Sequence, residues 1–223
     1  MKPVEQKAMS QEIIAKIRSA GVIAVLVVDD LEHAVPLAKA LLDGGVDTIE
    51  LTMRTPVALD AAKIIKKEFP EICLGMGTVL TTDQVKACAD IGADFAVAPG
   101  CNPSVISEAY RQKLSFAPGI MTPSDIEIAV EQGCRILKYF PAESAGGLNH
   151  LKNIAGPYQY LGLSFIPLGG LNLATAEAYI DSPMVAAIGG SWLAKQPVIQ
   201  AENWDEITKN AREITSLVQK IRE

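Results

Sequence analysis

The sequence lacks the features that mark several large classes of protein. No stretch approaches about 20 uninterrupted apolar residues, the length that a membrane-spanning helix needs. The opening, MKPVEQKAMS, has no apolar core of the kind found in a secretory signal. Lysine and arginine number 20 against 26 acidic residues, whereas a nucleic-acid-binding protein normally carries a basic face. We therefore expect neither a membrane nor a nucleic acid as a partner.

Metal-binding and redox motifs are also missing. No two cysteines form a C-x-x-C pair, which disfavours a zinc knuckle or a redox motif. The cysteines lie in apolar runs, as reduced core residues of a cytosolic protein do, so we expect a cytoplasmic protein. The two histidines, His33 and His150, have no partner at metal-ligand spacing. We expect no metal and no other cofactor.

Short strand-like runs recur along the chain at intervals of 20 to 28 residues. Helical patterns fill the gaps, and the runs begin near Val22, Thr48, Ile72, Phe95, Ser115, Ile136, Ser164 and Val185. Eight strands alternating with helices in about 200 residues match the unit count of a closed β/α barrel. We predict an α/β fold with one (β/α)8 TIM-barrel domain over residues 1–223. A doubly wound open sheet is the alternative, which the absence of G-x-G-x-x-G disfavours.

Capping residues locate several helix starts. Ser10 precedes an apolar-periodic segment and predicts an extra N-terminal helix. Asn102–Pro103 and Thr122–Pro123 each place a capping side chain before a proline at the first helical position. A last helix is predicted from Trp204 to Ile221, with its apolar residues on one face.

An internal repeat relates three of the predicted strands. Each follows a glycine, and alignment of these glycines places Glu50, Val97 and Lys138 at the same position. These are the second, fourth and sixth strands, and alternate strands of a barrel contribute side chains to one interior layer. We therefore expect Glu50 and Lys138 to meet inside the barrel.

The second strand alternates apolar and polar residues, so its polar side should point inward. A buried Glu50 needs a partner. Of the lysines in the sequence, Lys138 is the one that lies in the middle of a predicted apolar strand. One interpretation is an ion pair that only fills the core, or a lysine whose head reaches solvent. The functional interpretation is an amine nucleophile, because desolvation favours the neutral form that attacks.

Two glycine-rich loops are candidate anion sites. Gly169–Gly170 follows the seventh predicted strand, and Gly189–Gly190–Ser191 follows the eighth. The loops after these strands are the usual phosphate site of a TIM barrel, where backbone amides and helix N-termini meet the anion. Simple tight turns are the alternative. A third segment, Gly75–Thr78, is either a carboxylate site or a turn.

Taken together, these residues resemble the 2-keto-3-deoxy-6-phosphogluconate (KDPG) / 4-hydroxy-2-oxoglutarate (KHG) aldolase family, which are class I aldolases. The resemblance runs from about Gly21 to Ala194. The segments that carry it are Ile49-Glu-Leu-Thr-Met-Arg-Thr55, Gly75-Met-Gly-Thr-Val79, Ala98-Pro-Gly100, Pro118-Gly119, Lys138-Tyr-Phe-Pro-Ala-Glu143 and Ile188-Gly-Gly-Ser-Trp-Leu193.

The resemblance implies roles for individual residues. Lys138 forms the Schiff base, and Glu50 is the general acid and base. The implied substrate-binding residues are Arg54 and Thr78 for the pyruvate carboxylate, Pro99 and Phe140 for the pocket walls, and Gly169, Gly170, Gly190 and Ser191 for the phosphate. The resemblance also implies a homotrimer, no metal and a covalent intermediate in place of a cofactor.

The expected reaction is cleavage of KDPG to pyruvate and D-glyceraldehyde 3-phosphate, a step of the Entner-Doudoroff pathway. Leu168 departs from the family, which commonly has threonine there, so a hydroxyl that could contact the aldehyde half is lost. Such a loss can change substrate preference. The alternatives are cleavage of KHG to pyruvate and glyoxylate, a phosphate-binding epimerase, or a ligand sensor without catalysis.

Overall fold

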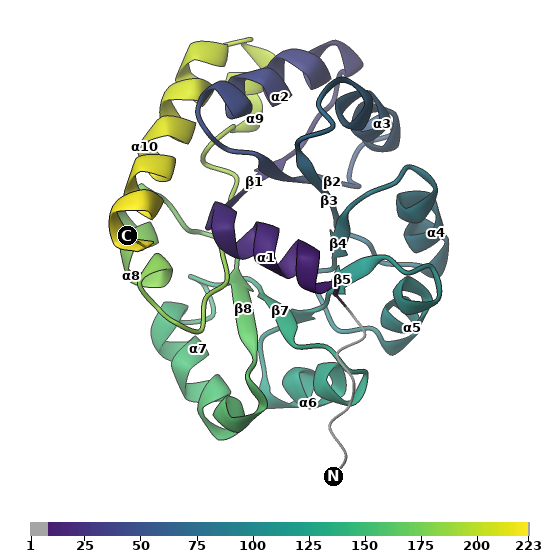
Figure 1. Ribbon diagram of the computed structural model, residues 1–223, viewed down its shortest axis with the longest axis vertical. Coiled ribbons are helices and arrows are strands. Elements are labelled where there is room, and N and C mark those ends of the chain that lie inside the picture. The colour runs from purple at the N-terminus through teal and green to yellow at the C-terminus, as the bar shows by residue number, and fades with distance from the viewer. Residues whose placement is uncertain (1–8, 223) are drawn as a thin grey trace.

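The computed structural model describes residues 9–222, with strands near the centre and helices around them (Figure 1). The helices are α1 Gln11–Ala20, α2 Ala34–Asp43, α3 Ala58–Glu68, α4 Thr82–Asp90, α5 Pro103–Arg111, α6 Pro123–Glu131, α7 Gly147–Ala155, α8 Leu173–Ile180, α9 Gln196–Gln200 and α10 Trp204–Arg222, with 3-10 turns η1 Leu31–His33 and η2 Gly156–Leu161. The strands are β1 Val22–Leu26, β2 Thr48–Thr52, β3 Cys73–Gly77, β4 Phe95–Val97, β5 Ser115–Ala117, β6 Gly119–Ile120, β7 Ile136–Tyr139, β8 Ser164–Pro167 and β9 Ile188–Gly190.

Hydrogen bonding divides these strands into two parallel sheets. One sheet has the order β5-β4-β3-β2-β1-β9, and the other has the order β6-β7-β8. The prediction of a closed eight-stranded TIM barrel is therefore wrong, although the predicted alternation of parallel strands with helices is observed.

Two local features separate the sheets. Pro118 lies between β5 and β6 and has no N–H to donate, so β5 pairs with β4 while β6 pairs with β7. On the other side, the described chain around β9 meets β8 through isolated bridges rather than a ladder. The eighth strand also begins at Ile188, later than the predicted Val185.

The ladders place the two sequence-predicted catalytic residues on different sheets. Glu50 lies in the middle of β2 and is opposite Val25 of β1. Lys138 lies in β7, opposite Gly119 of β6 and Ile166 of β8. Because successive side chains of a strand alternate, the neighbours of Glu50 along β2 pack into the apolar layer beneath the helices. Glu50 therefore faces the space between the two sheets.

A smaller apolar cluster fills the space between the sheets, distinct from the larger layer under the helices. α1 contributes three of its members, Ile13, Ile14 and Ile17. In Figure 1, α1 lies across the middle of the ring of strands. The predicted extra N-terminal helix is confirmed, and Ser10 caps it by accepting a hydrogen bond from the Ile13 amide.

Two further contacts show which end of the strands α1 covers. The Ser10 amide donates to Ser115 Oγ at 3.1 Å, and Ser115 is the first residue of β5. Arg18 donates to the hydroxyl of Ser164, the first residue of β8. α1 therefore covers the amino ends of the strands and leaves their carboxyl ends free for a site.

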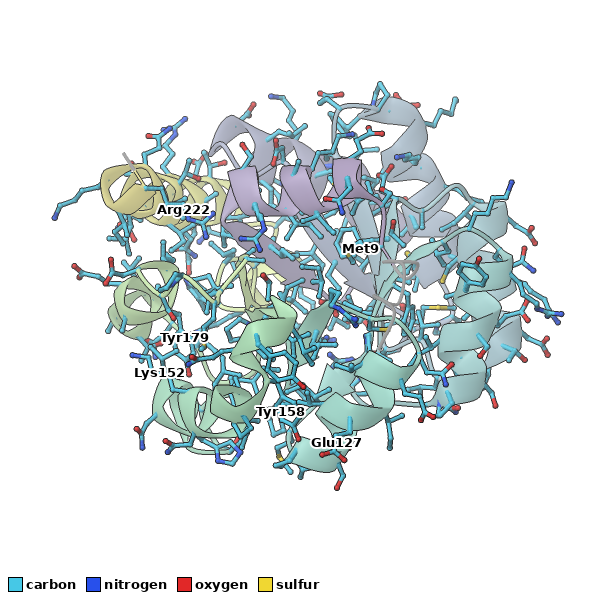
Figure 2. The ribbon with its side chains drawn as sticks, turned by 60° about the horizontal axis from the view of Figure 1, so that its bottom comes forward. Met9, Glu127, Lys152, Tyr158, Tyr179 and Arg222 are labelled. Carbon is cyan, nitrogen blue, oxygen red and sulfur yellow. The ribbon has the colours of Figure 1, made fainter. Side chains whose placement is uncertain are left out.

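The other predicted caps are also observed. Thr122 forms a capping box with Asp125 at the start of α6, and Asn102 accepts a hydrogen bond at the start of α5. Arg222 of α10, labelled in Figure 2, donates to the carbonyl of Ala186 at 3.0 Å, two residues before β9 begins. Within residues 9–222, no helix is long and apolar enough to cross a membrane.

Candidate active site

Lys138 and Glu50 meet between the two sheets. Lys138 Nζ donates to Glu50 Oε1 at 3.0 Å and lies 3.4 Å from Oε2. Lys138 is 5% exposed and Glu50 is 1% exposed, so the ion pair is nearly cut off from bulk water. The meeting of these two side chains is the contact that the repeat and the strand alternation predict.

The backbone around the pair is built closely enough to need glycine. A Cβ on Gly77, in β3, would lie 2.0 Å from Glu50 Oε1. A Cβ on Gly119, the ladder partner of Lys138, would lie 2.2 Å from the carbonyl oxygen of Pro99. On the other side of the amine, the Phe140 ring centroid is 5.6 Å from Lys138 Nζ. The strands therefore fix both reacting groups from several directions.

A pocket of about 380 Å³ opens above the lysine at the carboxyl ends of the strands. Five of the predicted site residues line it: Arg54, Lys138, Phe140, Gly169 and Ser191. Glu50 lies beneath it against Lys138. The remaining predicted residues, Thr78, Pro99, Gly170 and Gly190, do not line this pocket.

Thr78 supports a pocket residue from outside the pocket. Arg54 follows β2 and Thr78 follows β3, and Arg54 Nε donates to Thr78 Oγ1 at 3.3 Å. Thr78 has φ of 60°, an uncommon conformation for a β-branched residue. A hydrogen bond from a guanidinium leaves its other donors available, so Arg54 can still bind a carboxylate.

The two predicted glycine loops each contribute some residues to the pocket and leave others outside it. Gly169 and Gly170 have φ of 98° and 83°, values that L side chains rarely adopt. Gly169 faces Phe140 and the pocket, whereas a Cβ on Gly170 would lie 2.7 Å from the Cβ of Glu143. In the other loop, Gly189 and Ser191 line the pocket, and Gly190 lies under the Trp192 ring.

A hydrogen-bonded clamp holds the loop after β8 against the loop after β7. The Ala142 amide donates to Leu168 O at 2.8 Å, and the Glu143 amide donates to Gly169 O at 3.0 Å. The Glu143 carboxylate accepts a 2.6 Å hydrogen bond from the Tyr179 hydroxyl of α8. Burial, followed by this contact with Glu143, raises the pKa of Tyr179 above its ordinary value. The hydroxyl therefore remains a donor at physiological pH.

Several pocket residues were missed by sequence reasoning. They come from β1 and the loop after it, from the turn after β9, and from the start of α9: Val25, Val27, Ala194, Lys195, Gln196 and Pro197. Gly189 also lines the pocket and belongs to the predicted anion loop. Leu168 was noted as a departure from the family, and it forms an apolar wall packed over Gly189. Lys195 carried a usable signal, since it is a cation shortly after a glycine-rich loop at a strand end.

Among residues 9–222, no three His, Cys, Asp or Glu side chains gather as metal ligands do. The groups in and beneath the pocket are an amine beside a carboxylate, a guanidinium, a second amine, a hydroxyl and backbone amides. An amine and a carboxylate in contact provide a nucleophile and a proton acceptor for carbonyl chemistry.

Comparison with known proteins identifies the family. The family model for KDPG and KHG aldolase matches residues 13–210. The KHG/KDPG aldolase of Escherichia coli K12 is 42% identical over 192 residues, covering 86% of this chain and 89% of that protein. The 2-dehydro-3-deoxy-phosphogluconate aldolase of Haemophilus influenzae is 36% identical over 209 residues, covering 94% and 98% respectively.

A solved structure agrees with this assignment. A Legionella pneumophila KDPG aldolase, with pyruvate captured at low pH as a covalent carbinolamine intermediate, superposes with a TM-score of 0.86 at 36% identity. The match covers 90% of this chain and 96% of that one. The predicted enzyme class, an aldehyde-lyase, is confirmed by these relatives. The chain belongs to the KDPG and KHG aldolase family.

Proposed function

We propose that the chain cleaves KDPG to pyruvate and D-glyceraldehyde 3-phosphate through a Schiff base on Lys138. The observation that carries the mechanism is the 3.0 Å contact between Lys138 Nζ and Glu50 Oε1 beneath the pocket. Relatives named 2-dehydro-3-deoxy-phosphogluconate aldolase support the substrate, and the carbinolamine of the Legionella protein supports the covalent step.

The first half of the reaction forms the electron sink. Lys138 passes its proton to Glu50, and the neutral amine attacks the C2 carbonyl carbon to give a carbinolamine. Glu50 returns that proton to the leaving hydroxyl, so that water departs and a protonated imine remains. Arg54 binds the C1 carboxylate at the pocket wall, which orients C2 toward the amine. Phe140 and Leu168 provide apolar walls that limit the access of water.

The second half breaks the carbon–carbon bond. Glu50 takes the proton of the C4 hydroxyl, directly or through one water, and the C3–C4 electron pair moves into the imine to form an enamine. The aldehyde leaves with C4 to C6. Glu50 returns its proton to C3, and water then hydrolyses the imine, which frees pyruvate and Lys138.

The phosphate of the substrate belongs at the far end of the pocket from Arg54. Gly169, Gly189 and Ser191 line the pocket, and backbone amides with a hydroxyl suit an anion. The second candidate is cleavage of KHG to pyruvate and glyoxylate, because the Escherichia coli relative is named for both substrates. A homotrimer, a cytoplasmic location and a place in the Entner-Doudoroff pathway stay predictions from the resemblance.

Covalent trapping tests the proposal. Wild-type protein incubated with pyruvate and borohydride is expected to gain a pyruvate-derived adduct on the peptide that contains Lys138, read by mass spectrometry. Lys138→Ala is expected to abolish both the adduct and KDPG cleavage while circular dichroism stays unchanged. An adduct on another lysine, or turnover near the wild-type rate in that variant, would refute the role of Lys138.

A further inference from the structure

We infer that Lys195 recognises the phosphate charge of the substrate and sets the preference for phosphorylated over unphosphorylated keto acids. The inference rests on the proposed function, because it assigns a partner to the distal end of KDPG. It concerns a residue in the turn between β9 and α9 that lies outside every motif named above.

The first support is the charge distribution of the pocket. Three cations line it, Arg54, Lys138 and Lys195, and no Asp or Glu is among the lining residues. Lys138 is paired with Glu50 below the pocket. That leaves Arg54 and Lys195 to meet the two anionic groups of KDPG, a carboxylate at C1 and a phosphate at C6.

The second support is the position of each cation. Arg54 follows β2 and contacts Thr78 after β3, which lies on the side of the pocket assigned to the carboxylate. Lys195 comes four residues after Ser191, at the wall that Gly189 and Ser191 also form. β2 and β9 flank β1 in the six-stranded sheet, so the guanidinium and the ammonium reach the pocket from two different strand ends.

The third support is that the backbone of Lys195 is fixed while its ammonium is free. Its carbonyl accepts from the amides of Val198 and Ile199 at 2.8 and 3.1 Å. The next residue, Gln196, donates its side-chain amide to the Asp29 carboxylate, which ties this turn to the loop after β1. Asp29 accepts from this amide, and among residues 9–222 the Lys195 ammonium forms no salt bridge.

Lys195 is exposed in the structure, so its charge acts partly through water. A phosphate dianion that closes over it removes part of that water and gains a charge-assisted hydrogen bond. A keto acid without the phosphate gains nothing from this lysine. The contact is far from the breaking bond and is made equally in ground state and transition state, which places its effect in KM rather than kcat.

The test compares two substrates in matched variants. Lys195→Gln is expected to raise KM for KDPG about 10-fold with kcat within about 2-fold, as the loss of one charge-assisted contact implies. For the unphosphorylated analogue 2-keto-3-deoxygluconate, both constants should stay within about 2-fold. Lys195→Arg should keep the wild-type preference. Added salt should raise KM for KDPG more in the wild type than in Lys195→Gln.

Lys220→Gln is the control for net charge. Lys220 is exposed near the end of α10, where Arg222 reaches the carbonyl of Ala186 before β9, at the opposite end of the strands from the pocket. It is expected to leave both substrates unaffected. Lys195 has no such role if Lys195→Gln keeps the wild-type preference for KDPG, or if it slows both substrates equally. A wild type that shows no preference for KDPG contradicts the proposed substrate itself, and the inference falls with it.

Discussion

At the scale of the residue, Gly77 leaves the space that the Glu50 carboxylate occupies. A Cβ there would lie 2.0 Å from Glu50 Oε1 and 2.7 Å from its Cδ. The obstructing atoms belong to the end of a flexible side chain, so the fold can adapt at small cost. The carboxylate, however, cannot stay beside Lys138. The site thus depends on a residue that makes no contribution of its own to the chemistry.

Gly77→Ala is expected to keep the fold and lose about 100-fold in kcat, because a displacement of about 1 Å at a reacting group can have that effect. Steady-state kinetics measure the loss in kcat, and a thermal melt measures whether the fold is kept. Gly156→Ala is the matched control, since a Cβ there has no heavy atom within 4 Å. Activity of Gly77→Ala near the wild-type level would show that Glu50 does not need its present position.

Glu50→Gln separates Schiff-base formation from proton transfer. The amide keeps a similar shape but cannot accept the C4 proton, so kcat for KDPG cleavage should fall by about 10² to 10⁴. Borohydride trapping of pyruvate on Lys138 should persist. If trapping is lost together with turnover, Glu50 serves to activate the lysine, and its transfer of the C4 proton is not supported.

The sequence predicted the chemical pair better than the pocket. Lys138 and Glu50 could be matched because strand alternation has a fixed period and the repeat aligns their positions. Pro99 was expected to line the pocket, but its carbonyl packs under Gly119 instead. Lys195 was missed because a turn has no periodicity, so its place shortly after a glycine-rich loop was the one signal available in the sequence.

At the scale of the element, α8 holds the glycine loop that precedes it. Tyr179 is 2% exposed and donates to Glu143, whose own amide bonds to Gly169 O. The helix, the loop after β7 and the loop after β8 thereby form one hydrogen-bonded unit. Figure 2 shows Tyr179 among the packed side chains of this part of the molecule.

Tyr179→Phe is expected to lower the free energy of unfolding by about 1.5 to 3 kcal/mol, the usual value of a hydrogen bond to a charged group. Urea denaturation measures it. Tyr160→Phe is the control, because Tyr160 is 84% exposed. Equal stability of the two variants would mean that the Tyr179 hydroxyl contributes nothing to holding the loop.

Element starts were easier to predict than sheet pairing. The caps at Ser10, Asn102 and Thr122 act within one turn of the helix, so local sequence specifies them. The division into two sheets depends on where Pro118 falls relative to strands distant in sequence. Counting eight strand-like runs could not show that one of them is broken or that the last begins late.

At the scale of the whole molecule, the cysteines make stability sensitive to alkaline pH. Burial raises the pKa of the thiols from 9.0 to about 12 in Cys73, Cys88 and Cys134, and to about 11 in Cys101. Above pH 9 the unfolded chain releases these protons while the folded chain keeps them. Each buried thiol therefore destabilises the fold by about 1.4 kcal/mol per pH unit in that range.

Cys88→Ala isolates one of these contributions. The variant is less stable than the wild type at pH 8, because it loses buried volume. That deficit should shrink by about 1 kcal/mol between pH 8 and pH 10, since the variant has one thiol fewer to titrate. Urea unfolding at both pH values gives the difference in the free energy of unfolding between the two proteins. Titrating groups that both proteins contain cancel in this difference. A deficit that stays constant would contradict the raised pKa.

The position of α1 across the amino ends of the strands determines the route by which substrate enters and products leave. Because α1 covers the amino ends, substrate enters and both products leave through one opening, at the carboxyl ends of the strands. Under the proposed mechanism, the aldehyde half lies nearer this opening, while the three-carbon remnant is still bonded to Lys138 at the base of the pocket. The proposed mechanism and this single opening together predict the order of release, in which the aldehyde leaves first and pyruvate leaves last.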